Sequence, residues 1–392
     1  MDPVANPYRP GAGRRPPLLA GREPVIDAFD VVRRRAEEFG EGDRSWVLNG
    51  LRGVGKTVLL NELLSQVHGR GWISAKAEAG AAASLSVSLS QSLQRALRTA
   101  TGRHPEPRLR RLLGIFKAFS LKVDPSGIVS LGIDVQPIEG VADSGRFSDD
   151  LAALLDALGE TARELGVGVL VLIDELQEAP PDELAALNTA VHHVGQADVP
   201  VPVIVVGAGL PSLPAQLAEA TSYAERLYDY RPIGLLGELA ARDALTVPAQ
   251  ARGVEWADDG LDMAVENAGG YPYLIQAIGK HVWDSARGTP ISLEDVEVGL
   301  ALARTEVDDG LYRSRWERAT PVQRELLRAL AALGGDRPAA VVDIARSMGK
   351  GRTSDISVAR DEAIKKGLTY APERGLLAFT VPGMHEFIKR QP

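Results

Sequence analysis

Lys56 and Thr57 end a glycine-rich segment, Gly50–Thr57, whose residue types suit it to bind phosphate groups. The segment fits the pattern G-x-x-x-x-G-K-[ST], in which glycines let backbone N–H groups turn inward around an anion. The lysine ammonium can reach phosphate oxygens, and the threonine hydroxyl is a suitable ligand for Mg²⁺. We therefore expect seven residues to bind a nucleotide here: Gly50, Arg52, Gly53, Val54, Gly55, Lys56 and Thr57.

The elements that flank this segment agree with a phosphate-binding loop. The apolar stretch Ser45–Asn49 predicts a strand that leads into it, and Val58–Val67 predicts a helix that follows it. A helix N-terminus directed at the loop favours bound anions. A strand-to-helix turn that matches the pattern by chance is the alternative, and the agreement of strand, spacing and helix argues against it.

Two adjacent carboxylates, Asp174 and Glu175, follow the apolar stretch Val169–Ile173. Such an uninterrupted apolar strand fits a parallel sheet that is covered on both faces, and these sheets bind ligands at their carboxyl edge. We expect Asp174 to hold Mg²⁺ through water and Glu175 to polarise the attacking water. A helix N-cap is the alternative explanation for the acidic pair.

Composition excludes several classes of protein. With 392 residues the chain should form two or three domains, and 45% hydrophobic residues with a net charge of −8 are ordinary for a soluble protein. The absence of cysteine rules out disulfides, thiolate zinc sites and thiol nucleophiles. We expect Mg²⁺ as the only metal ion. We also expect a cytoplasmic protein without a membrane span, because the longest apolar stretch is far below the roughly 20 residues that a bilayer requires.

The order of predicted elements indicates an α/β core followed by helical domains. Strands alternate with helices, which predicts a parallel sheet with right-handed crossovers. The expected strands are Ser45–Asn49, Trp72–Ala77, Val169–Asp174, Val201–Val206 and Leu227–Ile233. The expected domains are an extended segment (1–25), a P-loop core (26–233) with an insertion at 78–146, a helical lid (234–312) and a winged helix (313–392).

Three of these regions have internal features of their own. The insertion should contain helices near 85–99 and 108–119 and then a β-hairpin over 120–135, which could contact a partner or merely cover a sheet edge. Ser292 is a plausible helix N-cap in the lid, and Thr320–Gln323 predicts a capping box in the last domain. There, three helices and a hairpin predict a winged helix.

These motifs resemble those of the AAA+ ATPases, in particular the archaeal and bacterial predicted ATPases related to STAND switches and to origin-recognition (initiator) ATPases. The resemblance covers nearly the whole chain and implies a P-loop core, a helical lid and a winged helix in this order. It also implies binding of ATP with Mg²⁺ and assembly into a homo-oligomer. Within it, Gly21 and Arg22 match an N-terminal segment that contacts adenine, and Pro272 in Gly269–Pro272 matches the lid motif.

The chain departs from the pattern of these families at two places, and the second, at Pro272, favours a switch over a fast motor. The segment Val206–Ser212 lacks the polar sensor 1 residue, and Pro272 stands where initiators carry the sensor 2 arginine. Gly269–Pro272 can also be explained without a nucleotide, as glycines that end one helix and a proline that begins the next. Arg226 resembles the arginine finger that completes a neighbour's site, with a surface ion pair as the alternative.

Two functions remain open after these comparisons of motifs. The first is an ATP-hydrolysing molecular switch, slow or stimulated by a partner, that couples nucleotide state to assembly or partner binding through the winged helix. The second is a DNA-binding initiator or loader, because residues 319–392 contain 12 Lys/Arg against 8 Asp/Glu. The cations that could meet phosphate are Lys350, Arg352, Arg360, Lys365 and Lys366. A small-molecule kinase, a GTPase and a metal site at His192–His193 are less consistent with the sequence.

Overall fold

A parallel five-stranded sheet forms the centre of the computed structural model, which describes residues 1–80, 84–103, 107–123 and 135–391. The strand order is β2-β3-β4-β1-β5 and all neighbouring strands are parallel. The strands are β1 (Ser45–Asn49), β2 (Ile73–Glu78), β3 (Val169–Asp174), β4 (Val203–Gly209) and β5 (Tyr228–Pro232). Their aliphatic side chains are buried because helices cover both faces of the sheet.

The strand order brings the two predicted motifs to one edge of the sheet. In register, Leu48 of β1 lies opposite Ala208 of β4, and Ile173 of β3 lies opposite Gly207. The carboxyl ends of β1 and β3 are thus separated by β4 alone. The glycine-rich loop after β1 and the carboxylates after β3 therefore face the same crevice, as the sequence predicts.

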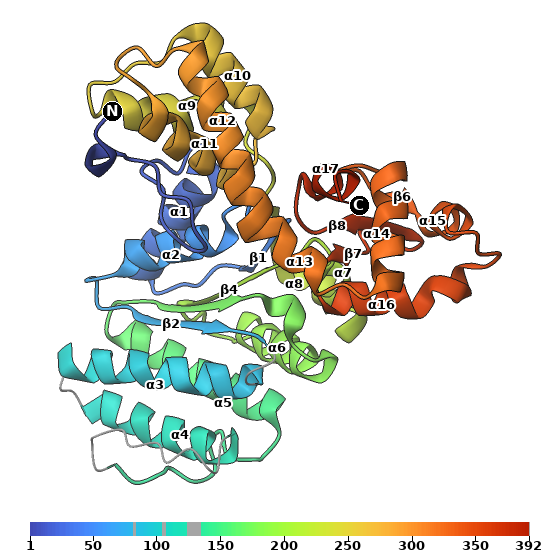
Figure 1. Cartoon of the computed structure of the whole chain (residues 1–392). Coiled ribbons are helices and arrows are strands. Elements are labelled where there is room, and N and C mark those ends of the chain that lie inside the picture. Colours follow the sequence, from blue (N-terminus) through green and yellow to red (C-terminus); the bar gives the residue numbers. More distant parts are fainter. Residues whose placement is uncertain (81–83, 104–106, 124–134, 392) are drawn as a thin grey trace.

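Helices cover the two faces of this sheet in separate groups (Figure 1). On one side lie α1 (Glu23–Phe39) and α2 (Lys56–Val67), and on the other α5 (Phe147–Glu164) and α6 (Pro181–Gly195). Two shorter helices, α7 (Leu213–Ala220) and α8 (Ala224–Leu227), lead into β5. Phe29 of α1 meets Trp46 of β1 edge to face, with ring centroids 5.9 Å apart. That aromatic pair fixes α1 on the sheet.

The insertion between β2 and β3 contains two long helices, as predicted, but no hairpin at its predicted start. These helices are α3 (Leu85–Arg103) and α4 (Pro107–Val123); α3 packs beside β2, and α4 packs on α3 and α5. The predicted strand from Ser120 onward is wrong for Ser120–Val123, which continue α4 because Phe116, Phe119 and Ser120 are buried on one helical face. The rest of the predicted hairpin, 124–134, lies outside the described residues.

A four-helix unit follows the sheet in the region predicted for the lid. Its helices are α9 (Glu238–Gln250), α10 (Asp258–Ala268), α11 (Pro272–Ser285) and α12 (Leu293–Val307). Ser292 caps α12 with a capping box, in which its hydroxyl accepts from the Asp295 N–H and the Asp295 carboxylate accepts from the Ser292 N–H. The predicted N-cap is therefore confirmed. A π-helical segment, η3 (Asp308–Arg313), and α13 (Ser314–Glu317) continue α12 toward the last part of the chain (Figure 1).

The C-terminal part has the helices and the small antiparallel sheet of a winged helix. Its helices are α14 (Pro321–Leu333), α15 (Val341–Ser347), the one-turn η4 (Thr353–Ile356), α16 (Ser357–Lys365) and α17 (Met384–Lys389). The strands β6 (Ala339–Ala340), β7 (Thr369–Tyr370) and β8 (Leu376–Phe379) form a sheet in the order β6-β8-β7. Thr320 and Gln323 form the predicted capping box at the start of α14.

Buried apolar side chains form two separate clusters, and the boundary between them is called the seam below. One cluster fills the α/β core and the insertion, while the other runs continuously through the four-helix unit and the winged helix. Tyr8 and Ala20 of the N-terminal segment belong to the second cluster. In the described ranges, no helix is long and apolar enough to cross a membrane.

Candidate nucleotide site

Lys56 is folded over its own loop. Gly55 has a φ of +98° and precedes the first residue of α2, so the loop turns sharply into the helix. The Lys56 side chain is buried, and Nζ donates to the carbonyls of Gly50 at 2.8 Å and Leu51 at 2.7 Å. Burial lowers the pKa of this amine to about 8, although the carboxylates of Glu175 and Asp174 oppose the shift.

The oxygens expected to hold Mg²⁺ lie at the same edge of the sheet. Thr57 is in the first turn of α2, and its hydroxyl makes no hydrogen bond within the described ranges. Asp174 is almost fully buried at the end of β3, where one carboxylate oxygen accepts from the Glu175 N–H at 3.0 Å. Lys76 lies 3.9 Å from its other oxygen. One hydroxyl and one carboxylate suit Mg²⁺, which completes its coordination with water and substrate phosphates.

Two neighbours contact the side chain of Glu175, whose backbone conformation is strained. Its φ is +50°, in the left-handed region that non-glycine residues rarely adopt. Gln177 Nε2 donates to Glu175 Oε2 at 2.6 Å, while Gln177 Oε1 accepts from the N–H of Leu210 at 3.0 Å. The Arg52 guanidinium lies 3.5 Å from Glu175 Oε1. Gln177 thus ties the predicted water-activating carboxylate to the loop after β4, a role that the sequence alone did not show.

A cavity of about 290 Å³ adjoins the glycine-rich loop and contains most of the predicted site residues. Arg52, Gly53, Val54, Gly55, Lys56, Thr57, Glu175, Arg22 and Pro272 line it. Gly50 lies beneath it and contributes the carbonyl that Lys56 contacts. Asp174 and Gly21 are beside the cavity without lining it.

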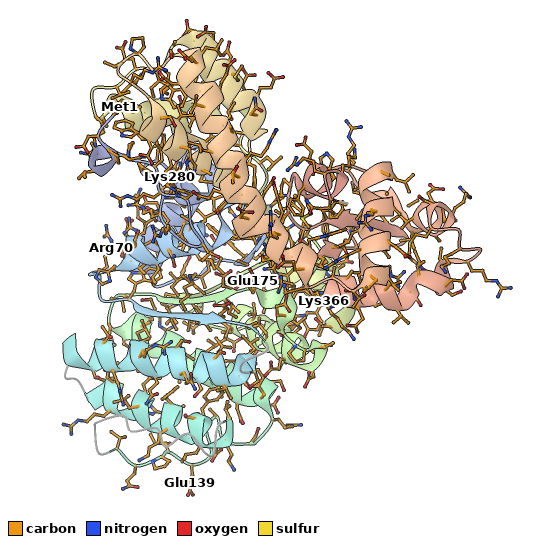
Figure 2. The ribbon with its side chains drawn as sticks, in the orientation of Figure 1. Met1, Arg70, Glu139, Glu175, Lys280 and Lys366 are labelled. Carbon is orange, nitrogen blue, oxygen red and sulfur yellow. The ribbon has the colours of Figure 1, made fainter. Side chains whose placement is uncertain are left out.

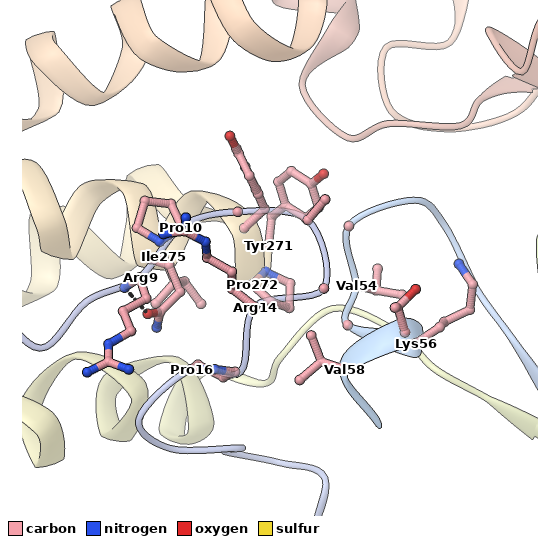
Figure 3. Close-up of a pocket in the computed structure, with 18 of the residues that line it drawn as sticks. Arg9, Pro10, Arg14, Pro16, Val54, Lys56, Val58, Tyr271, Pro272 and Ile275 are labelled. Atoms are coloured by element: carbon pink, nitrogen blue, oxygen red, sulfur yellow. Dashed lines mark hydrogen bonds between the residues drawn. The ribbon is translucent and has the colours of Figure 1, made fainter. Parts of the chain in front are cut away.

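The N-terminal segment forms one wall of this cavity. Figure 3 shows the segment with Arg9, Pro10 and Arg14 passing between Pro272 and the loop that carries Val54 and Lys56. The Arg9 N–H donates to the side chain of Gln276 on α11 at 3.1 Å. The segment therefore lines the cavity, and its contact with the base of a nucleotide stays a prediction.

Arg22 connects the nucleotide-binding loop to the segment after β5 through hydrogen bonds. Its Nη2 donates to the carbonyl of Val54 at 2.9 Å and to that of Gly234 at 2.7 Å. Burial lowers the pKa of this guanidinium. The Arg22 side chain therefore holds the loop in place through these hydrogen bonds, and it also lines the cavity.

Tyr271 packs directly on the loop, and the sequence did not single it out. A Cβ at Gly53, whose φ is +78°, would lie 2.0 Å from the Tyr271 hydroxyl oxygen. Only glycine fits this position, because of both the backbone conformation and the approach of the phenol. Burial raises the pKa of Tyr271, so the hydroxyl is neutral and acts as a hydrogen-bond donor or acceptor.

The winged helix also contacts the nucleotide-binding loop. The Arg52 N–H donates to the carbonyl of Thr380, just after β8, at 3.0 Å. A Cβ at Gly367 would lie 3.1 Å from the Arg52 guanidinium, so the turn after α16 also packs on this residue. Figure 2 labels Glu175 where the sheet meets the winged helix and Lys366 close to this junction.

Arg226 lies away from the loop of its own chain. It is in α8, immediately before the amino end of β5, whereas the loop follows the carboxyl end of β1. Its exposed side chain has no acidic partner in the described part of the chain. It lines a second cavity of about 630 Å³, beside the stacked rings of His192 and Tyr223. A site within one chain therefore does not include Arg226.

Residues 18–206 match the family described as AAA ATPase domain, and residues 309–388 match a domain of unknown function, DUF8462. The Walker-type ATPase PABY2304 of Pyrococcus abyssi is 17% identical with a TM-score of 0.58, over 97% of this chain and 98% of that chain. The ORC2 protein of Aeropyrum pernix, solved as ADPNP-ADP complexes, is 16% identical with a TM-score of 0.56, over 97% and 96%. At these identities the likeness shows the fold alone. No curated protein matches the chain.

The family match covers the loop, α2 and the β3 carboxylates, and the structure brings these elements to one crevice. Together with the two structural likenesses, this arrangement confirms the resemblance inferred from the motifs. Residues 18–206 are therefore an AAA ATPase domain, and the chain as a whole has a P-loop NTPase fold.

Proposed function

We propose that the protein is a molecular switch in which bound ATP sets the position of the winged helix relative to the sheet. In this proposal hydrolysis is slow or stimulated by a partner, and the winged helix contacts a protein or DNA partner. The contact between Thr380 and the N–H of Arg52 carries the proposal, because it joins the winged helix to the nucleotide-binding loop itself. A change in the conformation of the loop therefore alters its contact with the winged helix directly.

Nucleotide is suited to bridge the two apolar clusters because the cavity has walls from both. Lys56 and Thr57 come from the core, whereas Pro272 and Ile275 come from the four-helix unit. Two described contacts cross the seam, the hydrogen bond from the Arg52 N–H to Thr380 and the approach of the Tyr271 hydroxyl to Gly53, and both involve polar groups that can exchange with ligand or water. A ligand that binds one arrangement more tightly shifts the equilibrium by its difference in affinity.

The residues of the site have complementary roles in hydrolysis. Lys56, which donates to the carbonyls of Gly50 and Leu51, would donate to phosphate oxygens instead when nucleotide is bound. Thr57 and Asp174 would hold Mg²⁺, which would supply charge stabilisation to the phosphates. Glu175 orients the attacking water once Gln177 and Arg52 release it or reposition it.

We further propose that the active form is a homo-oligomer in which Arg226 completes the site of a neighbouring subunit. Its exposure and its distance from its own loop along the sheet support this role. An arginine supplied by a neighbour stabilises the charge of the transition state.

The switch can be tested by energy transfer between two dyes. The chain has no native cysteine, so Glu160→Cys on α5 and Val358→Cys on α16 label two exposed positions, one on each side of the seam. We expect ATP to change the transfer efficiency relative to ADP, and we expect no such change with Lys56→Ala. Equal transfer with ATP, with ADP and without nucleotide would contradict the switch, provided that calorimetry shows that both nucleotides bind.

A further inference from the structure

Arg315 is one of several cations that line the nucleotide cavity, and it comes from outside the matched AAA ATPase domain. It lies in α13, directly after the π-helical segment η3, and its side chain is partly buried. Its Nη1 donates to the carbonyl of Leu311 at 2.7 Å. In the residues that the structure describes it has no acidic partner, which is unusual for an arginine removed from solvent.

Arg52 approaches the same cavity from the opposite side of the seam. Its Nε atom is buried without a hydrogen-bond partner. Burial lowers the pKa of Arg315, and the charge of Arg52 lowers it further, so the two guanidiniums repel each other across the cavity. An anion placed between them removes this repulsion and satisfies free N–H donors.

The position of this pair indicates which part of a nucleotide would lie there. Arg52 is 3.5 Å from Glu175, the carboxylate that faces the water attacking the terminal phosphate. Lys56 and the loop N–H groups follow Arg52 in the sequence. In a loop of this type, such groups bind the inner phosphates. The two arginines therefore flank the terminal phosphate end of the cavity.

We propose that Arg315 and Arg52 form a subsite for the terminal phosphate of ATP, so that Arg315 distinguishes ATP from ADP. This inference rests on the proposed switch and adds to it the residue that senses nucleotide. Pro272, in the lid motif, has no charge to offer at this point. Arg315 supplies the missing cation from the junction between the four-helix unit and the winged helix.

The same junction is tied to the winged helix on its other side. The Tyr312 hydroxyl donates to the carbonyl of Pro382 at 2.7 Å, and Asp308 pairs with Arg390 at 2.7 Å. Both tethers come from η3, a π-helical segment of a kind that is frequent at functional sites. Arg315 engagement by phosphate therefore moves the segment that holds the winged helix.

The test compares the affinities of the full-length protein for ATP and ADP. Calorimetry in the Glu175→Gln background, which keeps ATP intact, measures both. We expect Arg315→Gln to weaken ATP binding about 10- to 100-fold, as for loss of a charged hydrogen bond, and to change ADP binding less than about twofold. Arg315→Lys, which keeps the charge, should recover part of the ATP preference.

Arg313→Gln is the matched control, because Arg313 is exposed in the same junction and pairs with Asp309. It should leave both affinities unchanged. An unchanged ratio of ATP to ADP affinity in Arg315→Gln overturns the subsite, whatever its thermal stability. If the ratio falls as expected but ATP does not change dye transfer in the parent protein, the subsite stands and the switch fails.

Tyr312→Phe separates sensing from transmission. It removes the hydroxyl bonded to Pro382 and keeps the ring that packs on Phe387. We expect this variant to keep the ATP preference and to lose part of the ATP-dependent change in dye transfer. Loss of the ATP preference in Tyr312→Phe would show that the junction acts as structural support only and would overturn the role of Arg315 as the sensor.

Discussion

The protonation of the Lys56 amine is expected to change when nucleotide binds, so proton uptake can be used to follow binding. Its pKa of about 8 in the free protein lies below the ordinary value of 10.5. Phosphates favour the charged amine and raise that pKa, so binding takes up a proton wherever the free amine is neutral. ATP affinity should therefore be steady below about pH 7 and fall as the pH rises through about 8.

Calorimetry in buffers of different ionisation enthalpy checks this prediction. We expect uptake of close to one proton at about pH 9 and close to none at about pH 6. Lys56→Arg is the control, because a guanidinium stays charged throughout this range. Equal proton uptake in the two proteins would mean that another group titrates.

Glu175 and Glu178 offer a matched pair for assigning the residue that activates water. Both lie near Arg52, at 3.5 Å and 3.6 Å, and Gln177 donates to both carboxylates. Glu175→Gln should reduce steady-state hydrolysis about 100-fold or more with ATP affinity kept, because the amide cannot act as a base. Glu178→Gln should stay within about twofold. A similar loss in both variants would indicate that the charge near Arg52 matters rather than a base.

The sequence predicted the residues of the site that belong to contiguous motifs. Lys56, Thr57, Asp174 and Glu175 were identifiable because their spacing is set by one loop and one strand end. Tyr271 was not identified as a contact of Gly53, and Arg315 was not identified at all. An arginine that acts through tertiary packing looks like any other of the 44 basic residues in the chain.

At the scale of elements, the structure corrects one expectation about the winged helix. Lys366 is not free to contact phosphate, because Nζ donates to the carbonyl of Arg318 and to Gln323 Oε1, each at 2.9 Å. Gln323 is also the residue that completes the capping box of α14. Lys365 is exposed and pairs with Glu362 at 3.3 Å. Of these two lysines, only Lys365 remains a candidate for contact with DNA.

Charge reversal at the two positions should therefore have different effects. Lys366→Glu should destabilise the start of α14 by about 1–3 kcal/mol, because a carboxylate would replace a donor facing two oxygens. Lys365→Glu should change stability by less than about 0.5 kcal/mol. Hydrogen exchange of the α14 amides measures both. Equal protection in the two variants would show that the Lys366 contacts do not support the cap.

Element types were predicted better than element ends. The strand Ser45–Asn49 was predicted with the bounds that the structure shows, and the capping box Thr320–Gln323 was predicted where α14 begins, because a buried run and a capping box are defined locally. β4 extends to Gly209 because β1 supplies partners in register, which no local pattern indicates. At Ser120–Val123 alternation was mistaken for a strand, since burial against α3 and α5 decides the helix.

At the scale of the whole molecule, the continuous apolar cluster of the four-helix unit and the winged helix predicts how the protein moves. Separating these two parts would expose side chains such as Trp316 and Val307, which are buried within that cluster. Motion across the seam would open the cavity and change the contacts of Arg52 with Thr380 and of Tyr271 with Gly53. We therefore expect the two parts to move together against the sheet, with η3 as the place where small adjustments occur.

Assembly provides the last test at this scale, because Arg226 cannot reach the loop of its own chain. Arg226→Ala should keep ATP affinity and reduce hydrolysis, since a neighbour's arginine stabilises the transition state rather than bound ATP. Mixing Arg226→Ala with Lys56→Ala subunits creates some interfaces with an intact loop and an intact arginine, and activity should rise above that of either variant alone. Arg44→Ala is the control, because this exposed side chain lines the same 630 Å³ cavity. Mixtures that show only the summed activity of their components would exclude a shared site, and Arg226 would then be a surface residue.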